Sequence, residues 1–380
     1  MSETTRSTER IARTSVRAPR VVIAHDWLVR YAGSERCVEE MLKAFPGASV
    51  LTTLVRPAHL PEALRDARPS FLQRIPGAVD RHEWFLPLMP AAWRYTRVPD
   101  DVDAVVSSSH ACAKAVPLPA QTPHLCYCHT PMRYAWDFEL EQERFPRGSR
   151  TVARGMMAGF RRWDRSSASN VTRFMANSRA VADRIRRFYG REAQVVPPPV
   201  RTDYFTPAGE PGDEFLYVGR LNGYKRPDLV VEAFRGLPFR LTVVGSGSML
   251  PALRDAAGEN IEFREHVDDD VLRELYRRAR AMVYPVDEDF GIVMAEAQAC
   301  GTPVISIDAG GARDIVDHGE TGWLLRRRSV DDLRRAITRA AKEDLDRDEI
   351  HRRAARFSTA AYRAALLDAV EEIIADPRPV

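Results

Sequence analysis

Residues 282–300 read MVYPVDEDFGIVMAEAQAC, in which a short apolar run, an acidic loop and a longer apolar run follow one another. The first run has the length of a buried strand, and the run after Gly291 is long enough for a helix. A strand that leads through a short loop into a helix is the unit of a parallel sheet covered by helices. This stretch therefore predicts an α/β fold.

The same alternation occurs along most of the chain. In the first half the predicted strands are residues 21–24, 49–52, 104–107, 124–128 and 173–176. In the second half they are residues 215–218, 240–244, 261–263, 282–284, 304–307 and 323–325. Helices are predicted between the strands, and the residues after 330 are predicted to be helical, ending in a helix at 362–374. We expect two Rossmann-like, doubly wound domains facing a cleft, because such sheets bind ligands at the carboxyl ends of their strands.

The three prolines at 197–199 separate the two series of strands. Proline cannot continue a helix or a central strand, so we place a domain boundary there. The predicted organisation is a disordered tail at 1–18, one domain at 19–196, a second at 197–360 and a last helix at 361–380 that crosses back onto the first domain. The tail lacks the apolar stretch of a secretory signal, and its two glutamates count against a transit peptide.

The composition is that of an ordinary globular protein. Of the 380 residues, 44% are hydrophobic and 29% are charged, and no apolar run is long enough for a transmembrane helix. The net charge of +3 does not indicate nucleic-acid binding. The five cysteines are odd in number, and a chain of this length does not need disulfides, so we expect a reducing cytoplasm.

The acidic loop and the helix that follows it predict an anion site. Free amides at the helix start, near Phe290, Gly291 and Ile292, would point toward a ligand. Glu288 and Glu296 would repel phosphate, so hydroxyl groups are their better partners, and a sugar or ribose beside a phosphate satisfies both needs. The alternative is that both glutamates are solvated charges at a helix start.

The loop after residues 215–218 carries Arg220 and Lys225, the latter one of four lysines in the chain. An arginine fork together with the point charge of a lysine suits a diphosphate, although both could be ordinary surface cations. Gly245 and Gly247 resemble the opening of a dinucleotide fingerprint whose third glycine is missing, which favours a tight turn near a base or phosphate over an NAD site.

In the first half, Gly33 and Ser34 precede a helix and offer a second backbone cradle. His129 opens a loop of polar and aromatic residues that would suit a carbohydrate acceptor. The acceptor-side residues of this loop are Arg133, Tyr134, Trp136 and Asp137.

Two further patterns in this half have alternatives. A metal site at residues 124, 126, 128 and 129 is disfavoured, because on a strand residue 129 points away from the other three. Residues 144–165 contain seven arginines among apolar side chains. They predict either a basic helix lying on anionic lipid or a solvated helix packed by its apolar face.

With these residues in place, the chain resembles the family 4 glycosyltransferases of the GT-B type from about residue 21 to residue 325. Glu288 and Glu296 match the family's glutamate pair, and Arg220 with Lys225 matches its diphosphate-binding pair. The flanking matches are DFGI at 289–292, GTPV at 301–304, the glycines at 310–311 and TG at 321–322. His129 and Gly33 match first-domain positions near the transferred sugar and the phosphates.

Residues 25–28, 107–111 and 127–137 look like a subgroup that includes mannosyltransferases of bacterial O-antigen assembly. The departures from the family pattern are Ala32 in place of a glycine, Arg264 with Glu265 in place of a glycine turn, and Asp314 in place of a glutamate. These departures concern how the donor base and the acceptor are recognised, and they do not change the expected fold.

The resemblance implies a retaining hexosyltransferase that uses a nucleoside-diphosphate sugar, with GDP-mannose as the first choice and UDP-hexoses next. The acceptor would be a glycan or a lipid-linked sugar, at the inner face of the cell membrane if anionic lipid is contacted. No cofactor, no metal and no nucleic acid are expected. A sugar-nucleotide epimerase and a non-catalytic nucleotide-sugar-binding partner remain alternatives.

The resemblance also implies a role for each site residue. Glu288 and His129 would be catalytic, and Glu296 would bind the ribose. The implied diphosphate-binding residues are Arg220, Lys225, Gly33, Ser34, Phe290, Gly291 and Ile292. Gly245 and Val267 would lie beside the base.

Overall fold

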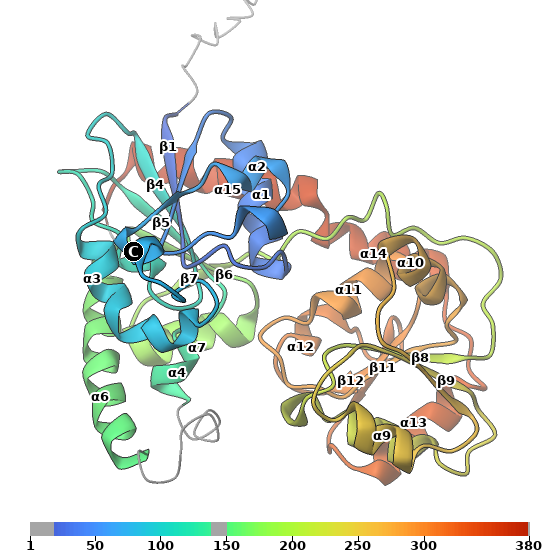
Figure 1. The fold of residues 1–380 in the computed structure, drawn as a ribbon. Coiled ribbons are helices and arrows are strands. Elements are labelled where there is room, and N and C mark those ends of the chain that lie inside the picture. The colour runs from blue at the N-terminus through green and yellow to red at the C-terminus, as the bar shows by residue number, and fades with distance from the viewer. Residues whose placement is uncertain (1–18, 138–149, 379–380) are drawn as a thin grey trace, which may run out of the picture.

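The computed structural model describes residues 19–137 and 150–378, which form two parallel α/β domains (Figure 1). The described part of the first domain has the strand order β3-β2-β1-β4-β5-β6-β7, and that of the second has β10-β9-β8-β11-β12-β13. In each sheet the order reverses beside the first strand of the domain, β1 or β8, as in doubly wound folds. The predicted fold class is confirmed. The predicted tail at 1–18 lies outside the described residues.

The strands of the first sheet are β1 (Val21–His25), β2 (Ser49–Thr52), β3 (Arg68–Pro69), β4 (Ala104–Ser109), β5 (His124–Cys128), β6 (Arg173–Ala176) and β7 (Ala193–Val195). Those of the second are β8 (Phe215–Val218), β9 (Leu241–Val244), β10 (Ile261–Arg264), β11 (Met282–Tyr284), β12 (Val304–Ile307) and β13 (Gly322–Leu325). The predicted strands agree within two residues at each end. The sequence analysis missed β3 and β7, which are short edge strands without an apolar run.

The helices of the first domain are α1 (Gly33–Ala44), α2 (Glu62–Arg65), α3 (Met89–Arg94), α4 (Arg133–Trp136), α6 (Arg150–Ser167) and α7 (Arg179–Tyr189). Those that follow are α8 (Pro227–Phe234), α9 (Leu250–Ala256), α10 (Asp269–Arg278), α11 (Ile292–Ala299), α12 (Ala312–Ile315), α13 (Val330–Ala340), α14 (Arg347–Ala354) and α15 (Thr359–Ala375). Of the helices that the structure describes, none combines the length and the apolar character needed to span a bilayer.

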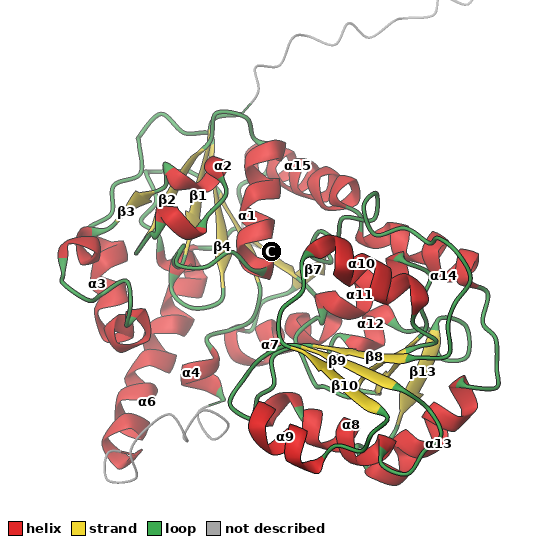
Figure 2. Cartoon of the chain, turned by 45° about the vertical axis from the view of Figure 1, so that its right-hand side comes forward, coloured by secondary structure: helices red, strands yellow, loops and turns green. Residues whose placement is uncertain are grey.

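Helices cover both faces of the first sheet, as the alternation of its buried strand residues requires. Val21 and Ile23 of β1 pack with α1 and α15, whereas Val22 and Ala24 pack in the cluster that contains α3 and α4. The last helix, α15, lies beside α1 in both views (Figures 1 and 2). Tyr362 of α15 is buried in the same cluster as residues of α1.

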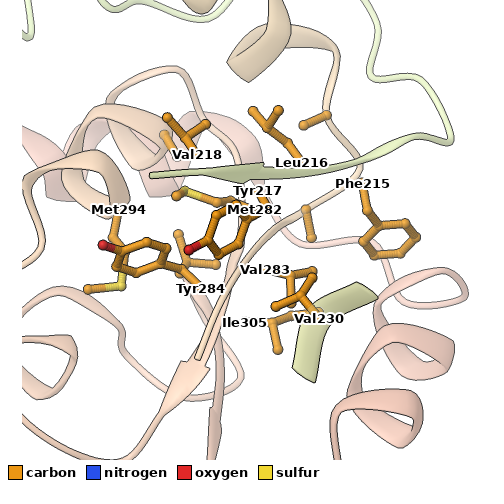
Figure 3. Packing of buried hydrophobic residues seen from close by; sticks show 14 of the residues in the cluster. Phe215, Leu216, Tyr217, Val218, Val230, Met282, Val283, Tyr284, Met294 and Ile305 are labelled. Atoms are coloured by element: carbon orange, nitrogen blue, oxygen red, sulfur yellow. The ribbon is translucent and has the colours of Figure 1, made fainter. Parts of the chain in front are cut away.

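The second sheet places two buried tyrosines on neighbouring strands. Tyr217 of β8 and Tyr284 of β11 have ring centroids 5.8 Å apart, and Figure 3 shows their hydroxyl groups pointing the same way. Both rings are almost completely buried. Because β8 and β11 flank the point where the strand order reverses, the Tyr284 hydroxyl lies where doubly wound sheets bind ligands.

Candidate functional site

The loops after β8 and β11 bring Lys225 and Glu288 together. Lys225 ends the short 3₁₀ helix η8 (Gly223–Lys225), where it forms an ion pair with Glu288 and donates a hydrogen bond to the Tyr284 hydroxyl at 2.6 Å. The Tyr284 hydroxyl donates in turn to Glu288 Oε2 at 2.8 Å. Tyr284 was not among the predicted residues, although its place at the end of a strand could have indicated it.

The electrostatic environment of Lys225 favours an incoming anion. Burial lowers the pKa of Lys225, and the nearby Arg220 and Arg133 charges act in the same direction. Arg220 is exposed, donates to the Tyr224 hydroxyl at 2.6 Å and lies near that ring. The three cations Lys225, Arg220 and Arg133 outnumber the two carboxylates Glu288 and Asp289, which leaves positive charge for a phosphate group to neutralise.

The start of α11 is an uncapped helix N-terminus beside this cluster. Gly291 is the N-cap residue, with φ of +93°, no side chain caps it, and the first turn contains no acidic residue. A Cβ at Gly291 would lie 2.4 Å from Met294 Cε, so glycine fits both the conformation and the space. The amides of Ile292 and its neighbours therefore have no side-chain cap, and their role as an anion site stays a prediction.

Two glycine turns support these loops by close backbone packing. A Cβ at Gly245 would lie 1.9 Å from the Gly219 carbonyl oxygen, in the loop that carries Arg220. A Cβ at Gly310 would lie 2.3 Å from the carbonyl oxygen of Glu288. The incomplete dinucleotide fingerprint that begins at Gly245 is thus explained by packing. Val267, the second predicted base-side residue, is partly buried after β10, and the base-side role stays a prediction.

Glu296 lies inside α11 and is contacted from the other domain. Its Oε1 accepts a hydrogen bond from Arg36 of α1 at 3.0 Å, and its Oε2 accepts one from the Tyr276 hydroxyl at 3.3 Å. Burial raises the pKa of Glu296, and the Arg36 charge opposes that shift. Arg36 was missed because nothing in the spacing of α1 distinguishes it from other surface arginines. The ribose-binding role of Glu296 stays a prediction.

The predicted cradle in the first domain lies one turn from that contact. Gly33 and Ser34 begin α1, which has Ala32 as its N-cap. The Ala32 amide is already bonded to Glu35 Oε2 at 3.0 Å, which leaves the amides of Gly33 and Ser34 as the donors a phosphate could use.

Further ion pairs join the strand-end loops of the two domains. Arg133 of α4 lies 2.7 Å from Asp289. The backbone amide of Arg179 donates to Asp314 at 2.9 Å, and the guanidinium of Arg179 also pairs with that carboxylate. The carboxyl ends of the two sheets therefore face one another through these side chains. Asp314, which stands in place of the family's glutamate, is therefore paired with Arg179.

His129 belongs to a hydrogen-bonded chain at the carboxyl ends of β1, β4 and β5. Its Nε2 lies 2.8 Å from Ser108 Oγ, and that oxygen lies 3.0 Å from His25 Nδ1. His25 Nε2 is 3.5 Å from Glu35 Oε1. Ser108, another residue that the sequence analysis missed, fixes the orientation of the His129 ring.

His129 is expected to remain neutral throughout the physiological pH range. Burial, reinforced by the His110 and His25 rings, lowers the pKa of His129 to about 3, and burial lowers that of His124 to about 4. The unfolded chain therefore binds more protons below about pH 6.5, so the free energy of unfolding should fall as the pH drops through this window. In NMR titrations, the ring signals of both histidines should not shift between about pH 8 and 5. A midpoint near the ordinary pKa of about 6.5 would contradict this environment.

Trp136 and Asp137, two of the predicted acceptor-side residues, make their contacts within the first domain. The indole of Trp136 donates to Asp164 at 2.7 Å and stacks on Phe188 with centroids 4.3 Å apart. Asp137 pairs with Arg184 of α7. The side chain of Tyr134 lies outside the described residues. Trp136 and Asp137 thus hold α4 against α6 and α7, and an acceptor role for this loop stays a prediction.

Asp164 of α6 also forms a fully buried ion pair with Lys114. Breaking such a pair leaves an uncompensated charge, so Lys114→Met should lower the free energy of unfolding by about 3–5 kcal/mol. Lys43 is the control, because its own side chain is 49% exposed and its partner Glu40 keeps a second cation, Arg363, so Lys43→Met should change stability by about 1 kcal/mol or less. Urea unfolding of the two variants checks the difference, and equal effects would contradict it.

The described part of the arginine-rich segment packs by its apolar face. Met157 is buried in α6, and Phe160 and Trp163 pack against the core beneath α3. Met156 is the large apolar residue of this part that stays exposed. Residues 144–149 lie outside the described part. The packed-helix alternative therefore accounts for residues 154–165, whose side chains the structure describes.

Among the described residues, no group of three or more His, Cys, Asp or Glu side chains is arranged to hold a metal ion. A cavity of about 390 Å³ lies in the second domain between the strands and α10, lined by residues such as Glu214, Thr242 and Arg273. It shares no residue with the loops that carry Lys225, Glu288 and Glu296. The candidate site is therefore defined by these loops and not by that cavity.

Comparisons with known proteins agree with this geometry. The family model described as Glycosyltransferase Family 4 matches residues 31–204, and the one described as Glycosyl transferases group 1 matches residues 205–362. A D-inositol 3-phosphate glycosyltransferase of Geodermatophilus obscurus is 35% identical over 52% of this chain and 53% of its own length. The chain thus spans about half the length of the curated relatives it matches.

Solved structures show the same fold at low identity. Anabaena Alr3699/HepE in complex with UDP and glucose has a TM-score of 0.68 at 16% identity, over 92% of this chain and 99% of its own. Sucrose-phosphate synthase from Thermosynechococcus elongatus has a TM-score of 0.71 at 19% identity, over 94% and 99%. Together the family models cover both domains, from residue 31 to residue 362. The chain belongs to glycosyltransferase family 4 and has the GT-B fold.

Proposed function

We propose that this chain is a retaining hexosyltransferase whose donor is a nucleoside-diphosphate sugar. The observation that carries the proposal is the uncapped start of α11 beside Lys225 and Glu288, at the strand reversal of the second sheet. This arrangement offers amides and cations to a diphosphate, and a carboxylate to the hydroxyl groups of a sugar.

Each part of the donor then has a partner. The amides at the start of α11, with Lys225 and Arg220, would stabilise the negative charge that develops on the leaving diphosphate without requiring a metal ion. Glu296 would accept hydrogen bonds from the ribose, and Glu288 from the transferred sugar. His129, which is neutral, would position the sugar or the acceptor hydroxyl by a hydrogen bond. Gly33 and Ser34 would contact the phosphates from the first domain.

In the proposed transfer, the acceptor oxygen forms a bond to the anomeric carbon as the bond from that carbon to the phosphate oxygen breaks. The electron pair of the broken bond leaves with the diphosphate. The proton of the acceptor hydroxyl passes to that departing oxygen, which lies on the face where the acceptor arrives. The acceptor oxygen attacks from the face that the diphosphate leaves, so the anomeric configuration is retained without a covalent bond to a protein residue.

The donor and the acceptor belong to the proposal. The subgroup resemblance implies GDP-mannose as the donor. Because solved structures of the same fold contain UDP, we also consider uridine donors. We place the reaction in the cytoplasm, because all five cysteines are buried and free of disulfides, as a reducing compartment favours. The acceptor would be a glycan or a lipid-linked sugar of the cell envelope.

Product analysis with UDP-, GDP-, ADP- and dTDP-hexoses tests the proposal, with and without EDTA. We expect release of one nucleoside diphosphate, dependent on added glycan or glycolipid acceptors and unaffected by EDTA, and NMR of the product should show the donor's anomeric configuration. An epimerised donor without acceptor would instead identify an epimerase. Binding without any release of nucleoside diphosphate would identify a non-catalytic partner.

A further inference from the structure

The segment that leads from the 3₁₀ helix η3 (His82–Leu88) through α3 exposes large apolar side chains. Trp84 is 79% exposed, Tyr95 is 74% exposed and Leu88 is 44% exposed. The neighbouring Met89, Ala92 and Trp93 are completely buried, so the segment is anchored by one face and leaves the other face open. We call residues 81–97 the η3–α3 surface.

The η3–α3 surface also has a net positive charge, because its three exposed arginines, Arg81, Arg94 and Arg97, outnumber its one carboxylate, Glu83. The ion pairs of the described part of the chain do not include these arginines. Arg81 lies near the Trp84 ring, at 5.9 Å from its centroid. Exposed tryptophan and tyrosine beside unpaired arginines are the composition of surfaces that contact the headgroup region of an anionic membrane.

This surface is continuous with the site through packed rings. His82 of η3 lies 5.2 Å from Trp27, which lies 4.6 Å from His110, and His110 lies 6.3 Å from His129, all between ring centroids. Both views place α3 on the side of the first domain that faces away from the second domain (Figures 1 and 2). The second domain therefore does not cover the η3–α3 surface. Only the rings of Trp27 and His110 lie between His82 of this surface and His129 of the site.

We propose that the η3–α3 surface docks onto an anionic lipid bilayer and brings the acceptor side of the site to the headgroup region. Trp84 and Leu88 enter the interface, and Arg81, Arg94 and Arg97 neutralise lipid charge. This replaces the arginine-rich helix as the membrane contact in the described part of the chain, because the apolar face of α6 is already packed. The inference rests on the proposed function only for the acceptor that the bilayer would present.

Vesicle flotation of the full chain, without any sugar donor, tests the proposal. We expect binding to vesicles that contain phosphatidylglycerol, weak binding to pure phosphatidylcholine, and loss of binding at high salt. Trp84→Ser with Leu88→Ser should weaken binding about tenfold or more, since both apolar contacts are lost. Ile374 on α15 is 40% exposed, which is similar to the exposure of Leu88. Ile374→Ser is therefore the control and should leave binding unchanged.

Charge-reversal variants show which of two basic regions, the η3–α3 surface or α6, contacts the membrane. Arg94→Glu should weaken binding at least fivefold, whereas Arg162→Glu on the exposed side of α6 should have a smaller effect. Brominated lipid should quench tryptophan fluorescence in the wild type and not in Trp84→Phe, because the other tryptophans are buried or partly buried.

Three results would overturn the proposal. They are no binding to anionic vesicles, unchanged binding of the Trp84 and Leu88 variant, and a larger loss for Arg162→Glu than for Arg94→Glu. Each variant is also assayed for thermal stabilisation by nucleoside diphosphates. That signal reports the proposed donor site, so failure of membrane docking and failure of the proposed function are distinguishable.

Discussion

Lys225→Ala is expected to abolish the thermal stabilisation that a saturating nucleoside diphosphate gives the wild type, and to lower the rate of sugar transfer by about 10²–10³-fold. Lys225 is the buried cation beside the start of α11, and its loss leaves Glu288 facing the diphosphate without compensation. Thermal-shift and initial-rate measurements check both effects. Lys342→Ala, at an exposed lysine of the same domain, is the control and should behave as the wild type.

A double variant shows whether Lys225→Ala acts by removing the cation or by leaving the Glu288 carboxylate unpaired. If Lys225 binds the diphosphate directly, Lys225→Ala combined with Glu288→Ala should still show no stabilisation. Recovery of binding in the double variant would mean that the single change acts through repulsion by Glu288. Unchanged binding in Lys225→Ala would contradict the assignment of the diphosphate site.

Asp26→Ala is expected to lower the free energy of unfolding by about 4 kcal/mol or more, the largest stability effect at a single residue of the site region. The completely buried carboxylate accepts hydrogen bonds from the backbone amides of His110, Ala111, Cys112 and Ala113, at 2.5 to 2.9 Å. Removing it strands these amides inside the protein, and each unsatisfied amide costs about 1–3 kcal/mol.

Urea unfolding followed by circular dichroism measures this loss. Asp66→Ala, at an exposed residue, serves as the control and should change stability by about 0.5 kcal/mol or less. Because the loop after β4 carries His110 next to the His129 chain, Asp26→Ala should also perturb His129. A loss below about 1 kcal/mol would show that water or other groups satisfy the amides as well as the carboxylate does.

The fold was predictable because buried parallel strands carry their own signal. Runs such as 282–284 and 304–307 are apolar except for Ser306, and the structure has fully buried strands at the same residues. The edge strand β7 lacks that signal, since both Gln194 and Val195 face solvent. The arginine-rich pattern of residues 144–165 predicted a helix in this part of the chain. Whether its apolar face is packed or exposed could not be predicted, because the packing depends on α3 and α4, which belong to other parts of the sequence.

The candidate site was predictable where a residue follows a strand directly. Lys225, Glu288 and Gly291 come from loops after β8 and β11, and the strand-end rule brings them to one edge of the sheet. Arg36 was not predictable, because its contact with Glu296 depends on how the two domains face one another. Trp136 lies on Phe188, a packing partner that no local pattern reveals, and its acceptor-side role stays a prediction.

We expect a nucleoside diphosphate to bind between the start of α11, the Lys225 loop and the start of α1. Hydrogen exchange measured by mass spectrometry, with and without a saturating nucleoside diphosphate, tests this binding site. Exchange should become slower in peptides that cover residues 219–226, 288–296 and 32–37, with little change around the cavity beneath α10. Unchanged exchange at the start of α11, or protection confined to the α10 cavity, would contradict it.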